Sequence, residues 1–144
     1  MSETDYTASD LTLVGGDHVA AYRKTGGEVG YLWNGVPTLL LTVTGRRSGQ
    51  PRTSALIFGR HGEDYLVVAS MGGAPMHPKW YLNLQANPAA EIQVRDRRIA
   101  VRACTATPEE KPQLWRIMAE LWPNYDAYQA RTSRDIPVVV LTPT

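Results

Sequence analysis

Three apolar, strand-like runs separated by two glycine-bearing turns occupy the stretch Thr38–Gly73, and this pattern constrains the fold most. The runs are Thr38–Thr44, Thr53–Gly59 and Tyr65–Ser70, and they are rich in the β-branched and aromatic residues that favour strands. A parallel return to the same sheet needs a crossover of roughly a dozen residues. The connections here are shorter, so the sequence predicts antiparallel neighbours.

Further strands and short helices flank this series. The alternating runs Glu91–Arg95 and Arg98–Thr105 predict a hairpin around Asp96-Arg97, and Ile136–Leu141 is typical of a buried strand. Helices are predicted over His18–Thr25 after an Asp17 N-cap, over Pro78–Ala86 with proline at the first helical position, from the capping box at Thr107 to Leu121, and over Asn124–Arg131. About six strands and three or four helices predict an α+β fold, a small antiparallel barrel with helices attached.

Length and charge fit a single soluble domain. The chain has 144 residues, with 15 basic and 14 acidic side chains and a net charge of +1. A near-neutral chain has no general field that attracts nucleic acid, so no nucleic-acid partner is expected. We expect a flexible arm over residues 1–16 and one domain over residues 17–144. Since no targeting segment and no apolar run of 18 residues is present, we expect a cytoplasmic protein.

Cysteine and histidine are sparse. The single cysteine, Cys104, excludes an internal disulfide and is expected to be a small buried side chain. His18 is expected on the surface of a first helical turn, and His61 at a solvated loop tip. No cluster has metal-ligand spacing, and phosphate-loop and dinucleotide-binding motifs are absent. Such a chain either binds a ligand or leaves the chemistry to a cofactor.

The first turn of the strand series is the most distinctive candidate site. It gathers Arg46, Arg47, Ser48 and Arg52, and no acidic residue stands between positions 29 and 62. Charge-assisted hydrogen bonds of roughly 1.5–3 kcal/mol each would let two or three of these groups hold a phosphate or carboxylate. Lys79 could add a further charge. The alternative is a solvated hairpin tip, which the residues alone leave open.

Four motifs, taken in order, carry a resemblance to a known family. They are TLLLTVTGRRSGQPR, the strand ending ASMGG, HPKWYLNLQANP and WPNYDAYQARTSRDIPVVVL. From Asp17 to Pro143 the chain resembles the deazaflavin-dependent nitroreductase family. The resemblance implies a split β-barrel that binds the deazaflavin coenzyme F-420. It also implies that a hydride passes from the reduced ring to a small organic acceptor, such as a quinone, an activated alkene or a nitroaromatic compound.

The resemblance implies roles for individual residues. It places the coenzyme's phosphate and carboxylate tail on Arg46, Arg47, Ser48 and Arg52. The residues implied around the ring come from two strand segments and two helices, and they are Thr53, Ser54, Ala55, Leu56, Ile57, Val68, Ala69, Ser70, Met71, Lys79, Trp80, Tyr81, Leu82, Asn83 and Tyr125. Tyr125 and Tyr128 would border the acceptor pocket, where Ser70 would hydrogen-bond the acceptor. Tyr125 is an expected proton donor, alongside water bound to Ser70 or solvent, because a phenol with a pKa near 10 is an acid and not a base.

Departures from the family pattern fall mostly on the acceptor side. Ile57, Met71 and Trp122 stand where a tyrosine, a lysine and a tyrosine occur in close relatives. The resemblance therefore implies hydride donation without fixing the acceptor. Two alternatives stay open, an FMN-dependent split-barrel oxidoreductase and a non-catalytic deazaflavin carrier. Contact between the N-terminal arm and a membrane that holds a quinone also stays open, as does the oligomeric state.

Overall fold

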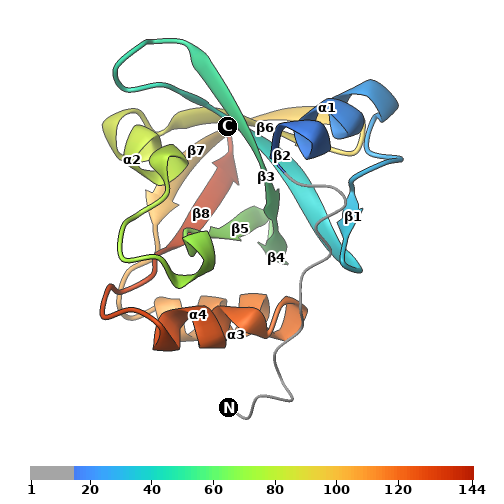
Figure 1. Cartoon of the computed structure of the whole chain (residues 1–144). Helices are drawn as coiled ribbons and strands as arrows, with labels where there is room; N and C mark the ends of the chain where they lie inside the picture. The colour runs from blue at the N-terminus through green and yellow to red at the C-terminus, as the bar shows by residue number, and fades with distance from the viewer. Residues whose placement is uncertain (1–14) are drawn as a thin grey trace.

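The computed structural model describes residues 15–144, whose strands form one antiparallel sheet curled into a barrel (Figure 1). The strands of this part of the chain are β1 (Leu32–Trp33), β2 (Val36–Thr44), β3 (Pro51–Ile57), β4 (Gly59–His61), β5 (Asp64–Val68), β6 (Ala89–Val94), β7 (Arg97–Thr105) and β8 (Val138–Pro143). The helices are α1 (Gly15–Thr25), α2 (Lys79–Ala86), α3 (Lys111–Leu121) and α4 (Asn124–Ala130), with a 3-10 turn at Met71–Gly73. No helix within residues 15–144 is long and apolar enough to cross a bilayer. The predicted α+β barrel is confirmed, with more strands than expected.

A bent segment made of β3 and β4 closes the barrel. From β2 the sheet runs through β6, β7, β8 and β5 to β4. Phe58 alone separates β4 from β3, and β3 pairs along its length with β2. The first half of the bent segment is thus bonded to β2 and the second half to β5. Because β3 has no second partner strand among the described residues, the barrel is split beside it.

The register of β3 directs backbone groups into this split. The Phe58 N–H donates to the Pro37 carbonyl at 3.1 Å, which makes these two residues a hydrogen-bonded pair. Bonded and non-bonded pairs alternate along an antiparallel ladder. Ala55 and Ile57 are therefore in non-bonded pairs, and their N–H and C=O groups point away from β2. Within residues 15–144 these backbone donors on the β3 side of the split have no partner strand.

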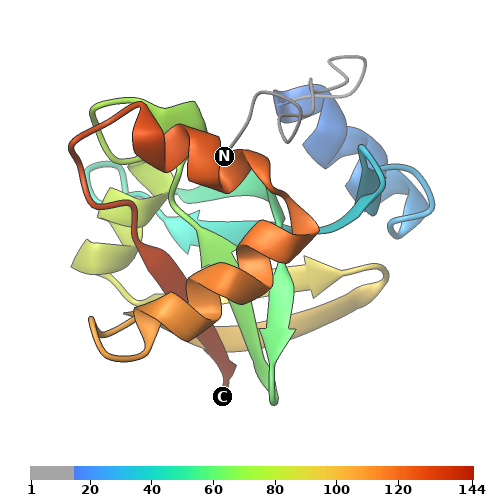
Figure 2. The ribbon, with the colours of Figure 1, turned by 90° about the horizontal axis from the view of Figure 1, so that it is seen from below.

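Two apolar clusters hold the fold together. The first fills the barrel and includes Leu39, Leu41, Val67, Ile92 and Leu141, which are all at most 1% exposed. The second lies between the outside of the sheet and helices α3 and α4, and includes Leu66, Leu114, Met118, Trp122 and Val138. Figures 1 and 2 show α3 and α4 together across one end of the barrel, at a wide angle to each other. This second cluster places the aromatic residues of α4 near the split.

Helix α1 begins earlier and packs more tightly than the sequence indicates. It starts at Gly15, so Asp17 lies within its first turn and is not the N-cap. The surface position expected for His18 is wrong, since this side chain is 4% exposed and its Nε2 lies 2.7 Å from the Gly30 carbonyl. A Cβ on Gly30 would lie 2.9 Å from the His18 ring, so the glycine permits this approach. The remainder of the predicted arm, residues 1–14, lies outside the described residues.

Other local expectations have mixed outcomes. Cys104 is exposed and not buried, because strand alternation directs Val101 into the barrel and Cys104 to the opposite face. Pro78 is the N-cap of α2 and not its first helical residue. The reciprocal hydrogen bonds of the capping box are present, from the Thr107 N–H to Glu110 Oε1 at 2.9 Å and from the Glu110 N–H to Thr107 Oγ1 at 3.3 Å. The predicted start of the helix is wrong, because α3 begins at Lys111 with Glu110 as its N-cap. The exposed position of His61 is also confirmed.

Candidate functional site: a cleft along the split of the barrel

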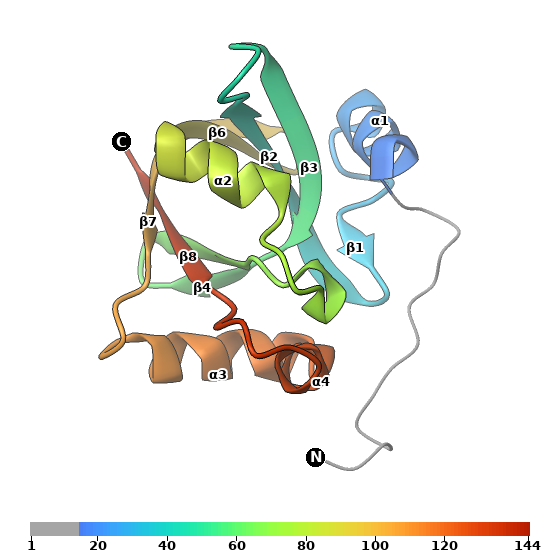
Figure 3. The same cartoon turned by 60° about the vertical axis from the view of Figure 1, so that its left-hand side comes forward.

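The arginine-rich turn between β2 and β3 docks on helix α2. The turn is closed by hydrogen bonds from the Gly45 N–H to the Gln50 carbonyl (2.8 Å) and from the Gly49 N–H to the Gly45 carbonyl (2.9 Å). From α2, the buried Asn83 accepts bonds at Oδ1 from the Arg46 backbone N–H (3.1 Å) and from Arg46 Nη1 (2.8 Å). Figure 3 shows α2 across the face of the barrel beside β2 and β3. Asn83 thereby fixes Arg46, while Arg47 and Arg52 are exposed.

A cationic cavity of about 420 Å³ lies under this turn. Its lining residues are Gly45, Arg46, Arg47, Ser48, Arg52, Ser54, Lys79, Trp80 and Asn83. Four of these side chains are basic and none is acidic, so the cavity suits an anionic group. We call it the arginine cavity.

A second, mostly apolar cavity of about 510 Å³ continues from the first along the split. It is lined by Ser54, Leu56, Val68, Ser70, Met71, Pro78, Lys79 and Trp80. Ser54, Lys79 and Trp80 border both cavities, so the two form one path. We call this second space the middle cavity.

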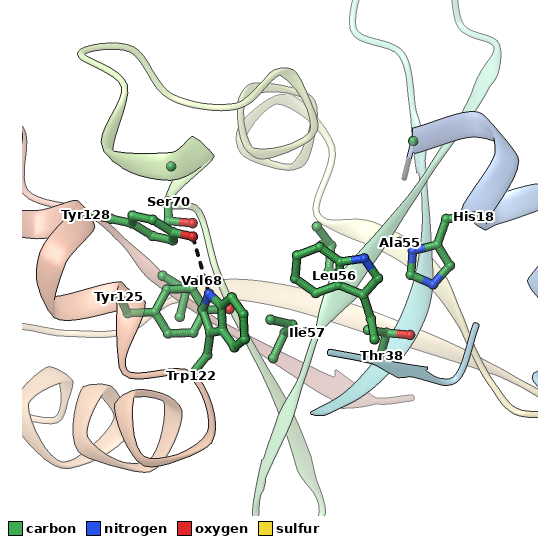
Figure 4. Close-up of a pocket in the computed structure, with 13 residues that line it drawn as sticks. His18, Thr38, Ala55, Leu56, Ile57, Val68, Ser70, Trp122, Tyr125 and Tyr128 are labelled. Carbon is green, nitrogen blue, oxygen red and sulfur yellow. Dashed lines mark hydrogen bonds between the residues drawn. The ribbon is translucent and has the colours of Figure 1, made fainter. Parts of the chain in front are cut away.

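The third cavity, of about 230 Å³, lies at the far end of the path and is rich in aromatic side chains (Figure 4). Its lining residues are Gly15, His18, Trp33, Thr38, Ala55, Leu56, Ile57, Val68, Ser70, Gly72, Trp122, Tyr125 and Tyr128. Leu56, Val68 and Ser70 also border the middle cavity. This aromatic cavity completes a cleft that is cationic at one end and aromatic at the other.

The two tyrosines of the aromatic cavity differ in environment. Tyr125 is 5% exposed, and burial, together with the neighbouring Tyr128, raises the pKa of its phenol far above the usual value. The Tyr128 oxygen accepts a hydrogen bond from Trp122 Nε1 at 3.3 Å, which leaves the Tyr128 proton available for another partner. Figure 4 shows the Ser70 and Tyr128 hydroxyls at the same end of the cavity. Tyr128 and Ser70 are therefore the hydroxyl donors best placed for a bound molecule.

Comparison with known proteins agrees with this geometry. The family model for the F420H(2)-dependent quinone reductase matches residues 16–143. An F420H(2)-dependent quinone reductase of Mycobacterium tuberculosis is 49% identical over 129 residues, which are 87% of this chain and 87% of that protein. The solved structure of an F420-H2 dependent reductase, FDR-A, has a TM-score of 0.68 at 38% identity and covers 73% of this chain and 93% of that chain. A structure described as a domain-swapped dimer has a TM-score of 0.71 at 33% identity, with coverages of 87% and 92%.

The chain belongs to the F420H(2)-dependent quinone reductase family. It is an oxidoreductase that uses coenzyme F-420, as the resemblance implied, and this favours F-420 over the FMN alternative and catalysis over a carrier role. The donor set fits the coenzyme. An anionic tail matches the arginine cavity, and a flat ring matches the apolar middle cavity, with the backbone donors of Ala55 and Ile57 at the border of the adjoining aromatic cavity.

Most of the residues that the sequence assigned to the quinone reductase site line the cleft. The arginine and middle cavities hold Arg46, Arg47, Ser48, Arg52, Ser54, Leu56, Val68, Ser70, Met71, Lys79, Trp80 and Asn83. The aromatic cavity adds Ala55, Ile57, Tyr125 and Tyr128. The structure thus gathers segments that lie far apart in the chain.

Four of the assigned residues border none of the three cavities. Ala69 is fully buried in the barrel core, and the Thr53 hydroxyl is bonded to Thr42 and to Arg23. Tyr81 points into the barrel and bonds to Thr105 Oγ1 at 2.8 Å, and Leu82 lines no part of the cleft. For α2 the reason is helical periodicity, because Lys79, Trp80 and Asn83 share the cleft face while Tyr81 faces the core.

Sequence reasoning missed several contributors. His18, Trp33, Thr38 and Gly72 line the aromatic cavity, and Trp33 packs on Trp122 with ring centroids 5.5 Å apart. Trp33 follows the apolar residues Tyr31 and Leu32 in the sequence, but nothing local indicates its partner Trp122. Arg134, which contacts the loop after β5, had no local signal, because its partners lie 57 to 65 residues earlier in the chain.

Proposed function

We propose that the cleft binds F-420 lengthwise, with the coenzyme's tail in the arginine cavity and its ring in the middle cavity, and that a quinone is reduced in the aromatic cavity. The continuity of the three cavities through Ser54, Leu56 and Ser70 carries this proposal. One end has the charge to hold an anion, and the other has the aromatic surface and hydroxyls to hold a planar acceptor.

In the arginine cavity, binding depends on a prearranged Arg46 and on the exposed Arg47 and Arg52. Asn83 accepts hydrogen bonds from one Arg46 Nη1–H and from the Arg46 backbone N–H. The other guanidinium N–H groups of Arg46 can therefore donate to a bound ligand. Charge-assisted bonds to phosphate or carboxylate contribute about 1.5–3 kcal/mol each. Lys79, which borders both the arginine and middle cavities, adds charge where the tail would meet the ring.

In the middle cavity, apolar side chains would contact the faces of the ring, and backbone donors next to the cavity would bond to its carbonyls. Leu56, Val68 and Trp80 provide surfaces that exclude water from a flat ring. The N–H groups of Ala55 and Ile57 point away from β2 at the border of the adjoining aromatic cavity, and from there they can donate to ring carbonyls. When bound, the reduced coenzyme supplies the hydride.

In the aromatic cavity, Tyr128 and Ser70 hold the acceptor oxygen. Trp122 orients the Tyr128 hydroxyl by donating to its oxygen, so that the Tyr128 proton faces the cavity. A hydrogen bond to a quinone oxygen favours the negative charge that develops there during hydride acceptance. Tyr125 lines the wall of this cavity and is not the proton donor, because its raised pKa makes it a weaker acid than an ordinary phenol. The final proton then comes from Tyr128 or from water held by Ser70.

Meeting a quinone at a membrane surface is a further part of the proposal. Leu11–Val14 in the segment before α1 is apolar in sequence, and quinones with long alkyl chains partition into lipid. Co-sedimentation with lipid vesicles, for the full chain and for a chain that begins at Gly15, tests this part separately. Binding of both chains alike, or of neither, would remove the segment from the proposal.

Ligand titration tests the proposed binding mode. The purified protein is titrated with F-420 and separately with FMN, followed by tryptophan fluorescence at low and raised salt. We expect binding of F-420 that weakens with salt, because the arginine cavity holds the tail by charge. Binding of FMN alone would contradict the proposal, and so would F-420 binding that is insensitive to salt.

A further inference from the structure

Arg134 lies between α4 and β8, and its guanidinium group forms its hydrogen bonds with the loop that follows β5. Its Nε–H donates to the Ala74 carbonyl (3.1 Å), one Nη1–H to the Ala69 carbonyl (3.0 Å) and Nη2 to the Ser70 carbonyl (2.8 Å). A fourth bond joins Nη1 to Nδ1 of His77 at 2.9 Å. Four of the five guanidinium N–H groups thus have partners in residues 69–77.

The contact with His77 fixes the state of the histidine. A guanidinium can only donate, so Nδ1 of His77 must accept, and the ring proton of the neutral form lies on Nε2. Burial and the Arg134 charge both lower the pKa of His77, which agrees with a neutral ring. Among the described residues the partners of the Arg134 guanidinium are carbonyls and this imidazole, and no carboxylate is among them.

The other end of Arg134 is tied to α4. Gln129, in α4, donates from Nε2 to the Arg134 carbonyl at 2.7 Å and accepts at Oε1 from the Ile136 N–H at 3.0 Å. The loop and α4 also touch directly, because a Cβ on Gly73 would lie 2.5 Å from the Tyr128 carbonyl oxygen. Arg134 therefore joins the loop that carries Ser70 to the helix that carries Tyr128.

We propose that Arg134 is a positioning residue that sets the distance between the Ser70 and Tyr128 hydroxyls by clamping the loop Ala69–His77 to the end of α4. Its catalytic consequence rests on the proposed function, whereas its effect on the loop does not. Arg134 lines none of the three cavities, so it acts through the loop and touches neither coenzyme nor acceptor. Lysine cannot replace it, because three tetrahedral N–H groups cannot reach three carbonyls and an imidazole in one plane.

The test compares Arg134→Lys with Arg116→Lys, an equal change at an exposed position of α3. The first readout is hydrogen exchange in the protein without coenzyme, at the Gly73 and Ala74 amides, which bond to the carbonyls of Ser70 and Met71. We expect exchange at these amides to rise by about tenfold or more in Arg134→Lys, with the β6–β7 hairpin unchanged. Arg116→Lys should match the wild type.

The second readout separates positioning from general damage. In Arg134→Lys the kcat for quinone reduction should fall by about 10–100-fold, since small displacements of binding groups cost this much. The Kd for F-420 should rise by a smaller factor than kcat falls, because the arginine cavity lies at the other end of the cleft and only Ser70 and Met71 of the clamped loop border the middle cavity. Unchanged exchange at Gly73 and Ala74 would overturn the clamp. A parallel loss of kcat and coenzyme affinity would overturn the positioning role.

Failure of the proposed function and failure of the clamp give different results. If the wild type fails to reduce a quinone with F-420, the proposed function fails, and the exchange measurement still decides whether Arg134 clamps the loop. If Arg134→Lys does not fold, His77→Leu removes one of the four bonds and the same two amides are measured. Faster exchange there supports the clamp, and exchange equal to the wild type overturns it.

Discussion

Arg46 keeps its place in the cleft because Asn83 holds both its backbone and its side chain. All four cations of the arginine cavity are exposed, and the bonds from Asn83 are what prepare the position of Arg46 before a ligand arrives. Preorganisation reduces the entropy that binding must offset. At the scale of single residues, affinity therefore depends on Asn83 as well as on the arginines.

A double-mutant cycle tests this dependence. We expect Asn83→Ala and Arg46→Ala each to weaken F-420 binding, and the double variant to bind no more weakly than Arg46→Ala. The coupling energy should lie in the range of about 0.5–3 kcal/mol that contacting residues show. Titration of all four proteins with F-420 measures it, with Gln85→Ala on the exposed side of α2 as the control. Additive effects would mean that Asn83 acts on the coenzyme independently of Arg46.

The two tyrosines of α4 should respond differently to loss of the hydroxyl. Tyr128→Phe removes the donor that faces the aromatic cavity, so kcat for quinone reduction should fall by about 10²-fold or more, the typical contribution of a positioned acid. Tyr125→Phe keeps the wall and should change kcat by less than about threefold, because burial makes that phenol a poor acid. Steady-state rates with reduced F-420 in excess decide this. A larger loss of kcat in Tyr125→Phe than in Tyr128→Phe would show that Tyr125 is the proton donor.

The loop that joins β5 to α2 packs closely against helix α4. Gly73 has φ +84°, and its Cα faces the backbone of Tyr128. Met71, in the same loop, has φ +47° although it carries a side chain, a strained conformation that binding sites often hold. The acceptor end of the cleft thus depends on backbone packing as much as on side chains.

Gly73→Ala should disrupt this contact. The new methyl group would lie 2.5 Å from the Tyr128 carbonyl oxygen, so we expect a loss of about 1–3 kcal/mol in the free energy of unfolding, together with slower quinone reduction. Gly62→Ala is the matched control, because Gly62 has φ +61° and a methyl group there would have no atom within 4 Å. Urea unfolding measures both variants. Equal losses would show that backbone strain alone, and not the contact with α4, sets the cost.

The His77–Arg134 contact makes the stability of this loop depend on pH. The folded protein lowers the pKa of His77 through burial and the Arg134 charge, and the other ring in contact with His77 is that of Tyr81. The unfolded chain therefore takes up a proton near pH 6.5 while the folded protein does not. Stability contributed by neutral His77 is complete above pH 6.5 and falls as the pH drops below that value.

His77→Gln keeps an acceptor for Arg134 and cannot titrate. We expect the wild type to lose more unfolding free energy than this variant between pH 7 and pH 5. Urea unfolding at several pH values gives the difference between the two proteins. A constant difference across that range would show that the pKa of His77 is the same in the folded and unfolded states.

Across the whole molecule, the strands were predictable and the cleft was not. Alternation and short glycine turns identified the strand series and the β6–β7 hairpin from local sequence alone. The Thr107–Glu110 pattern identified a pair of reciprocal hydrogen bonds, but not the start of α3. The break at Phe58 has no local signal in the sequence. Next to it Gly59 packs against α3, where a Cβ would lie 2.7 Å from Met118 Sδ, a contact between residues 59 positions apart. His18 and Cys104 were misplaced for the same reason, since burial depends on what packs against a face.

The candidate site divides in the same way. The arginine turn is contiguous in the sequence, so its charge was visible, whereas Asn83 and Arg134 act through contacts across 37 and up to 65 residues. The role of F-420 came from motif resemblance and family membership. The structure adds the order of the three cavities along the split. The central claim is therefore that the tail, the ring and the acceptor bind one after another along the cleft.

The most direct measurement is turnover by the purified full-length protein. Reduced F-420 and menadione are mixed with the enzyme, and the return of oxidised deazaflavin absorbance is followed at low and raised salt, with NADPH and reduced FMN as competing donors in separate reactions. We expect quinone-dependent oxidation of reduced F-420, a KM for the coenzyme that rises with salt, and no turnover with the other donors. Turnover with NADPH or reduced FMN and none with F-420 would contradict the lengthwise binding of this coenzyme in the cleft.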